Sequence, residues 1–198
     1  MSQEDLFSLP INPKISPDDI EDKVIPFLNK HKHLIYDLYF TTRMPPFMQD
    51  AMGDVFRGVN DSKQAVKNAF YIAQKTELPL SATFNNIWVK PDQKNLEEFI
   101  TNFKFLYDNG VRIATIPHTS WVMTGQIQKE YPELKIKNTI LREVSKPNEI
   151  VSLASAGFYY INLDRDVMRD RPLLDRIKEA KEYCAEKGNP VMLSLLAN

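Results

Sequence analysis

The sequence has one cysteine, few glycines and no long apolar run among its 198 residues. The single cysteine, Cys184, excludes a disulfide framework and a zinc site built from several cysteines of this chain. No apolar run approaches the roughly 18 residues that a membrane-spanning helix requires, and the first residues lack the basic and then apolar pattern of a secretory signal. The formal net charge of −1 offers no overall attraction to nucleic acid or to an anionic membrane. The composition therefore predicts a soluble, cytoplasmic, single-domain protein that binds neither nucleic acid nor a membrane.

The few glycines stand where amphipathic stretches give way to apolar runs. Gly110, Gly157 and Gly188 occupy such junctions, and glycine accepts the left-handed conformation in which helices commonly end. Pro79 and Pro132 mark two further junctions, because proline cannot continue a helix. Strands are therefore expected to begin near Leu80, Val111, Leu134, Phe158 and Val191. Between them, three segments carry an apolar stripe at helical spacing, namely residues 61–75, 95–109 and 172–187.

The N-terminal part of the chain departs from this repeat. Residues 18–31 predict a helix and residues 33–40 a strand ahead of the other five, so residues 1–32 are interpreted as a helical N-terminal extension of one domain spanning 1–198. Residues 41–61 form a long connection rich in methionine and phenylalanine. Connections longer than about 12–15 residues usually carry a function. We expect either a lid-like loop over the site or a segment that packs into the core.

Strand–helix–strand connections of this length give parallel neighbours with right-handed crossovers. Nucleotide-binding doubly wound sheets carry a glycine-rich turn after the first strand, and this chain has none there. We predict the parallel (β/α)-barrel lineage, as an incomplete TIM-type barrel of about six strands, with an open doubly wound sheet as the alternative. One strand is unusual, because Lys135 and Lys137 alternate with apolar residues. Either helices cover this strand poorly, or the lysine stems lie along the wall with their charged heads in water.

Polar side chains stand at the C-terminal ends of the predicted strands, where barrel enzymes have their sites. Asp164 is the candidate general base, and His118 is the candidate proton carrier because histidine titrates near neutral pH. The other candidates would bind substrate, arginine for an anion and asparagine for orientation. They are Asp37, Arg43, Asn85, Asn138, Asn162, Arg165 and Asn198. Asparagine also favours turns, so these residues would equally satisfy strand ends without any ligand.

Other chemistries have weaker support. Ser120 lacks the glycine-flanked turn of a serine hydrolase nucleophile. His118, Asp164 and Asp37 have no metal-ligand spacing, and no metal is predicted. Cys184 lies within a predicted helix, where a buried and unreactive thiol is expected.

Two C-terminal segments, AGFYYINLDRDVMRD and GNPVMLSLLAN, resemble proteins of the peptidase U32-like (β/α)-barrel group. The matching positions are Asn162, Asp164, Arg165 and residues 195–198. The resemblance implies a barrel enzyme, or a fragment of one, that binds a polar or anionic small substrate at the C-terminal mouth. Cysteines that several members associate with an iron–sulfur cluster are absent, so no cofactor is expected unless a longer chain supplies them. The alternative is a non-enzymatic binding or assembly module on a degenerate barrel.

The predicted strand count also bears on assembly. A closed barrel needs about eight strands, so the strands at 33–40 and 191–197 would each leave an unpaired edge that invites association. We expect either a truncated portion of a longer barrel enzyme, or a partial barrel that pairs with a second copy as a two-fold homodimer. An N-terminal segment folded over the open edge would remove the basis for that dimer.

Overall fold

The computed structural model describes residues 6–12, 14–49 and 59–195, with the backbone alone for residues 59–61. Seven parallel strands form one sheet, in the order in which they occur along the chain. They are β1 (Phe7–Pro10), β2 (Ile35–Thr41), β3 (Leu80–Thr83), β4 (Ile113–Ile116), β5 (Lys135–Asn138), β6 (Tyr160–Asn162) and β7 (Met192–Ser194). A doubly wound sheet reverses its strand order at a switch point, so the consecutive order excludes that alternative. The prediction of a partial parallel barrel is confirmed.

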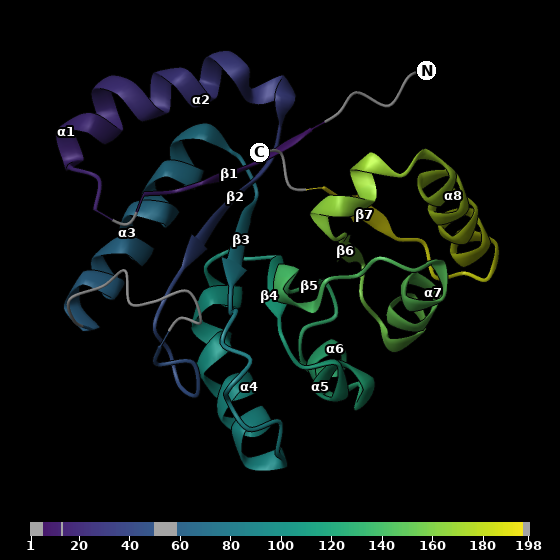
Figure 1. The fold of residues 1–198 in the computed structure, drawn as a ribbon. Helices are drawn as coiled ribbons and strands as arrows, with labels where there is room; N and C mark the ends of the chain where they lie inside the picture. Colours follow the sequence, from purple (N-terminus) through teal and green to yellow (C-terminus); the bar gives the residue numbers. More distant parts are fainter. Residues whose placement is uncertain (1–5, 13, 50–58, 196–198) are drawn as a thin grey trace.

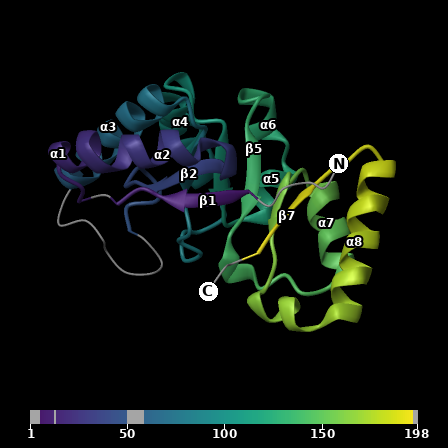
Figure 2. The same ribbon diagram turned by 90° about the horizontal axis from the view of Figure 1, so that it is seen from above.

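Helices connect the strands and lie around the outside of the sheet (Figures 1 and 2). They are α1 (Pro17–Asp19), η1 (Ile20–Val24), α2 (Ile25–His31), η2 (Lys32–Leu34), α3 (Val59–Thr76), α4 (Gln93–Asp108), α5 (Thr119–Met123), α6 (Gln126–Glu130), η3 (Ile140–Arg142), α7 (Pro147–Ala156), η4 (Arg165–Arg169) and α8 (Arg171–Glu186). The three long amphipathic segments form α3, α4 and α8, as the sequence predicts. In the part of the chain that the structure describes, no helix combines the length and the apolar character needed to cross a membrane.

The sheet is curled into an open half-barrel. Tyr36 of β2 and Tyr160 of β6 belong to strands four apart in the sheet, yet their ring centroids lie 5.3 Å apart. A flat sheet would separate these strands by about four times the 4.8 Å spacing of neighbours. The contact therefore lies on the concave side, and the helices occupy the convex side.

The convex face of the sheet is the core. Phe40, Ala82, Ala114 and Ile136 are partners in register on four neighbouring strands, and each is at most 2% exposed. Because side chains alternate across a strand, the residues between them point to the concave face. That face, opposite the helices, is where the polar residues of the strands must go.

The N-terminal segment differs from the expectation. Residues 17–31 are helical as predicted, but the extension also supplies β1, which adds a strand to the six predicted and pairs with β2 along its edge. Pro10 lacks a backbone donor, a feature tolerated on an edge strand, and only four residues make the strand. So short a run, ending in proline, carries little strand signal.

This pairing removes the premise that β2 has an open edge. Within the described residues the sheet now ends at β1 and β7, so the argument for a homodimer through residues 33–40 is wrong. The side chains of the last strand are partly covered. Val191 is buried and Met192 and Leu193 are half-buried, whereas Leu195 is 46% exposed.

The described part of the long connection after β2 packs into the core. Phe47 is 2% exposed, and its ring centroid lies 5.3 Å from that of Phe84 and 5.7 Å from that of Trp121. Met44, which bridges to Phe47, is also buried. Core packing is therefore the right interpretation for residues 44–47. The rest of the expected lid, residues 50–58, lies outside the described residues.

Glycines end helices where the sequence predicts them. Gly110, Gly157 and Gly188 have φ angles of 94°, 103° and 81°, a region that side chains with a Cβ atom adopt at a cost. At Gly157 a Cβ atom would also lie 2.6 Å from Nε2 of Gln128. That side chain donates a hydrogen bond to the Val122 carbonyl at 3.1 Å, so moving it aside costs that bond.

We expect Gly157→Ala to destabilise the protein more than Gly188→Ala. Both substitutions carry the cost of a left-handed residue, about 1–2 kcal/mol, but no atom lies within 4 Å of a Cβ added at Gly188. Urea denaturation of the two variants measures the difference. The double variant Gly157→Ala/Gln128→Ala removes the atom that clashes, so an unchanged gap between its stability and that of Gln128→Ala alone would contradict the steric explanation.

Candidate functional site

The concave face of the half-barrel is rich in hydroxyl and charged groups. One register row runs through Tyr39, Ser81, Ile113 and Lys135, and the next through Thr41, Thr83, Thr115, Lys137, Tyr160 and Met192. Members of a row share one face of the sheet. Asp37, two residues before Tyr39 on β2, belongs to the same face. The side of the sheet away from the helices is therefore the candidate site.

Asp37 is a buried carboxylate on this face. It is 1% exposed, and Oγ of Ser8 on β1 donates a hydrogen bond to it. Burial raises the pKa of Asp37, because a charge is less stable away from water. The Ser8 hydroxyl, the positive charge of Lys137 and the Ser81 hydroxyl act in the opposite direction. The β1 strand, which the sequence does not reveal, thus supplies a direct partner of the candidate carboxylate.

Lys137 is the opposite charge in the same space. It is half-buried as the penultimate residue of β5. Burial lowers its pKa, and the negative charge of Asp37 partly opposes this shift. β2 and β5 are three strands apart in the sheet, so the curvature of the sheet is what allows these two charges to influence each other.

Tyrosines complete the cluster. Burial, with the charges of Tyr159 and Asp37, raises the pKa of Tyr36 to about 12, so its hydroxyl stays protonated. The register between β1 and β2 slips at Phe7 and Ser8, which leaves Tyr36 without an opposite residue, as in a β-bulge. The slip explains how neighbours in sequence, Tyr36 and Asp37, both reach the concave side.

Tyr160 presents a hydroxyl with no use in the fold. The residue is 5% exposed, and among the described residues its hydroxyl has no hydrogen-bond partner. Buried hydroxyls are usually paired, and an unpaired one costs free energy. The term concave-face cluster is used below for Tyr36, Asp37, Ser81, Lys137 and Tyr160.

Asp37 was predicted from the sequence as a site residue, whereas Lys137 was not. The signal was present, since lysines at alternate positions of a buried parallel strand contradict the usual apolar run. Both lysines do lie along the concave wall, which is one of the two alternatives expected. Lys135 is exposed and its Nζ lies 4.7 Å from the centre of the Tyr159 ring. Lys137, by contrast, is half-buried, and its charge interacts with that of Asp37.

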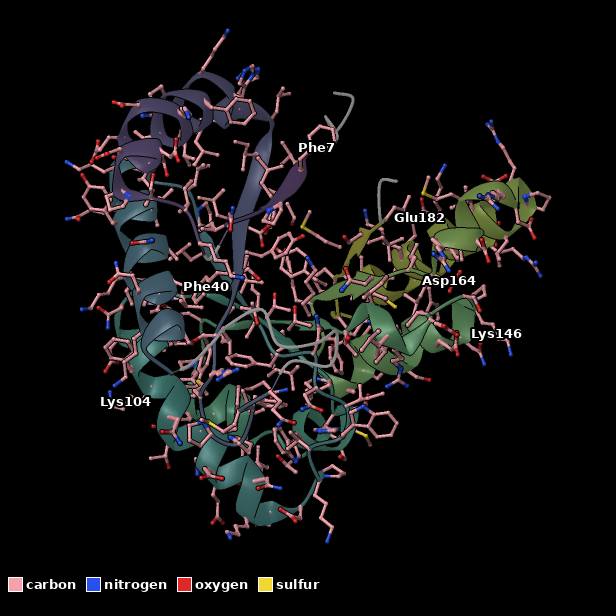
Figure 3. All side chains as sticks on the ribbon, turned by 60° about the vertical axis from the view of Figure 1, so that its left-hand side comes forward. Phe7, Phe40, Lys104, Lys146, Asp164 and Glu182 are labelled. Carbon is pink, nitrogen blue, oxygen red and sulfur yellow. The ribbon has the colours of Figure 1, made fainter. Side chains whose placement is uncertain are left out.

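The two predicted catalytic residues, His118 and Asp164, occupy different surroundings. His118 packs in the aromatic core, with its ring centroid 4.9 Å from that of Trp121 and 6.5 Å from that of Phe47. Burial lowers its pKa, and a hydrogen bond with the Val89 backbone partly opposes this. Asp164 caps η4 by accepting a hydrogen bond from the Asp166 backbone at 2.7 Å. Figure 3 shows Asp164 on the α7–α8 side of the molecule.

Asn138 and Asn162 are brought together, but to join strands. The Asn162 backbone donates to Oδ1 of Asn138 at 2.6 Å, and Nδ2 of Asn138 donates to the Asn162 carbonyl at 3.2 Å. Asn138 is 1% exposed. Its side chain therefore takes the place of a neighbouring backbone between β5 and β6, whose register has one pair, Lys137 with Tyr160. These bonds serve the sheet without any ligand.

The remaining predicted binding residues follow different strands. Arg43 is half-buried and its backbone donates to Oγ of Ser62 at 2.7 Å. Asn85 is half-buried after β3, and Arg165 is exposed at the start of η4. Asn198 lies outside the described residues. In the ranges that the structure describes, no three His, Cys, Asp or Glu side chains gather as metal ligands.

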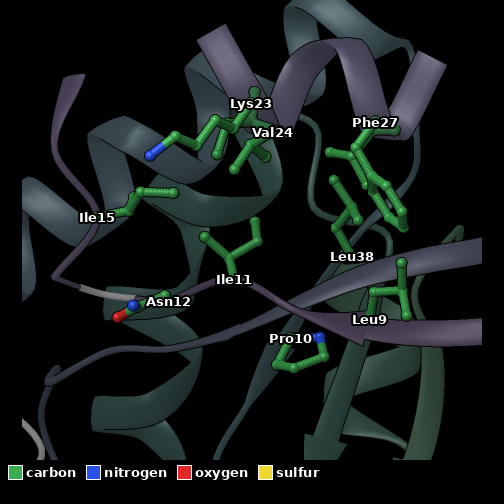
Figure 4. Close-up of a pocket in the computed structure, with 11 residues that line it drawn as sticks. Leu9, Pro10, Ile11, Asn12, Ile15, Lys23, Val24, Phe27 and Leu38 are labelled. Atoms are coloured by element: carbon green, nitrogen blue, oxygen red, sulfur yellow. The ribbon is translucent and has the colours of Figure 1, made fainter. Parts of the chain in front are cut away.

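A cavity of about 470 Å³ opens on the other side of β1 and β2, under η1 and α2 (Figure 4). Its walls are mainly aliphatic, and its polar members are Asn12 and Lys23. Lys23 is already paired with Asp19 at 2.6 Å. None of the candidate catalytic or binding residues lines this cavity, so it has the shape of a ligand pocket without groups suited to catalysis.

Comparison with known proteins supports the fold. No protein-family model matches the sequence, and no curated protein matches it. Among solved structures, the U32 peptidase Mk0906 superposes with a TM-score of 0.59 at 12% identity, over 98% of this chain and 70% of that one. A candidate racemase from Roseobacter denitrificans gives a TM-score of 0.58 at 12% identity, over 98% of this chain and 48% of that one. The expected similarity to a U32-like barrel is confirmed as a similarity of fold.

We expect Asn138→Ala to destabilise the protein by about 2–4 kcal/mol, since it removes several hydrogen bonds and leaves buried backbone groups unpaired. Asn85→Ala is the control, because the Asn85 side-chain oxygen has no hydrogen-bond partner among the described residues. Urea denaturation measures both. Equal losses in the two variants would contradict a strand-joining role for Asn138.

We expect the Lys137 amine to titrate below the ordinary pH range of a lysine, because burial lowers its pKa. Reductive methylation with ¹³C-formaldehyde makes each lysine visible by NMR, and a pH series reports each pKa. Because the pKa of Lys137 is lowered by folding, its contribution to stability is lost as pH falls through the folded pKa. Asp37→Asn removes the charge that opposes the shift, so the pKa of Lys137 should fall further. An unchanged pKa of Lys137 in Asp37→Asn would contradict an interaction between the two charges.

Proposed function

We propose that this chain is a barrel enzyme, or the greater part of one, that binds a polar or anionic small molecule against its concave face. The observation that carries the proposal is the pair Asp37 and Lys137. Two opposite charges from separate strands are withdrawn from water on the face of the sheet that lies away from the described helices. Perturbed titratable groups of this kind concentrate at functional sites.

Stability alone does not explain the pair. Removing two charges from water is expensive, and apolar residues of similar volume in their place are often as stable or more stable. Asp37 and Lys137 have no ion-pair contact in the described structure within 4.0 Å, although each influences the pKa of the other. A ligand that contacts both groups would offset the cost of withdrawing them from water.

The groups of the concave-face cluster have complementary abilities. Lys137 binds an anion when protonated and accepts a proton when neutral. Asp37 accepts a proton as the carboxylate and donates one as the neutral acid. The Tyr160 hydroxyl donates a hydrogen bond. We therefore assign proton transfer to Lys137 and Asp37 in place of His118 and Asp164, whose side chains already serve aromatic packing and a helix cap.

The structural neighbours support an enzyme fold but do not identify a substrate. One is named a peptidase and the other a candidate racemase, so the fold is one that enzymes use. This chain spans 70% and 48% of their lengths. Which polar molecule binds is therefore argued from the cluster alone.

A non-enzymatic module is the second candidate, and one observation favours it. Asn138, Asn162 and Asp164 hydrogen-bond within the fold, as strand-end residues without a ligand would.

We also keep a homodimer as a proposal, with β1 or β7 as the pairing edge in place of β2. A lone and buried Cys184 suits the reducing cytoplasm.

The test is the stability of the double variant Asp37→Asn/Lys137→Met. If the pair serves a ligand, removing both charges should raise the free energy of unfolding by about 1–2 kcal/mol, whereas each single variant leaves one charge unbalanced and should lower it. Lys135→Met is the matched control, an exposed lysine on the same strand and face, and should change stability little. A double variant less stable than the native chain would make the pair structural and favour the module.

A further inference from the structure

We propose that Lys137 forms a covalent imine with the carbonyl carbon of a small aldehyde or ketone held between Asp37 and Tyr160. This rests on the proposed function, because it requires the concave-face cluster to be the substrate site. It goes further by naming the class of substrate and the bond that forms.

The position of Lys137 suits a nucleophile. It lies on β5, which is paired on both sides, with Thr115 of β4 and Tyr160 of β6 as its partners in register. A reactive group on a strand inside the sheet is held more rigidly than one on a loop. A lysine attacks carbonyl carbon only as the neutral amine, and a desolvating pocket increases that fraction.

Other lysines of the described chain have different surroundings. Lys23 and Lys104 are exposed and paired with Asp19 and Asp108, at 2.6 and 2.8 Å, and those carboxylates raise their pKa. They are held as ammonium ions. Among described lysines with a resolved pKa shift, Lys137 alone shifts toward the neutral amine.

Tyr160 supplies an independent indication of a ligand. Its hydroxyl is buried, has no hydrogen-bond partner among the described residues, and belongs to the residue next to Lys137 in the register row. A carbonyl oxygen is an acceptor that this donor lacks. A carbonyl carbon within reach of Lys137 puts its oxygen near the Tyr160 side chain.

The step balances with these groups alone. The amine nitrogen attacks the carbonyl carbon, and the C=O electron pair moves to oxygen, where the Tyr160 hydroxyl stabilises the developing charge. Asp37 carries the two protons of the nitrogen to the oxygen in turn: the first converts the alkoxide into a hydroxyl, and the second lets that hydroxyl leave as water while nitrogen forms the C=N bond. The sum is amine plus carbonyl giving imine plus water, with no oxidant or reductant.

Borohydride trapping tests the proposal. The native chain is incubated with pyruvate or glyoxylate near neutral pH, treated with sodium borohydride, digested and mapped by mass spectrometry. The expected result is a reduced adduct on Lys137 in preference to all other lysines, present in the control Lys135→Met and absent in Lys137→Met. Tyr160→Phe and Asp37→Asn should slow trapping by about tenfold or more, the scale of a lost acid–base or oxyanion contact.

The outcomes separate the two proposals. Adducts spread over surface lysines, or none on Lys137 with either probe, overturn the imine. If the double variant Asp37→Asn/Lys137→Met is nonetheless more stable than the native chain, the proposed function stands without a covalent step. If it is less stable, both fail. Because the adduct is mapped on the native chain, the test does not depend on any variant folding.

Discussion

The rest of the structure depends on one constraint: one face of the sheet packs against the helices and is therefore apolar. Phe40, Ala82, Ala114 and Ile136 fill the register row that packs against the convex layer, and all are buried. Alternation along each strand then sends the intervening side chains to the concave side. Most polar residues of the strands are collected there, and the curvature of the sheet brings β2 toward β5 and β6.

The concave face shows a conflict between stability and another requirement. Asp37 and Lys137 are both disfavoured as charges by burial, and the Tyr160 hydroxyl is buried without a partner among the described residues. A chain selected for stability alone has no need for any of these groups. Asn138 shows the contrasting case, because its buried amide is fully engaged in holding β5 to β6.

Residues with local signals were predicted well. The glycine helix ends at Gly110, Gly157 and Gly188 follow from backbone freedom, a property of the residue itself. The strand β1 was missed because a four-residue run ending in Pro10 has too little pattern to identify. His118 and Asp164 were each predicted to handle protons because of their positions at strand ends. Such a position does not specify which way a side chain turns, and His118 turns into the aromatic core.

The sequence by itself determined the class of fold, since helix and strand periods and glycine positions are local properties that repeat along the chain. It also showed that Lys135 and Lys137 are unusual for a parallel strand, but not which groups they would meet. Only the tertiary structure decided which polar residues meet. Asp37 and Lys137 are a hundred residues apart in the chain, and their interaction depends on how strongly the sheet curls. That curvature is a collective property of seven strands and their helices, because it arises from packing between elements that no local pattern encodes.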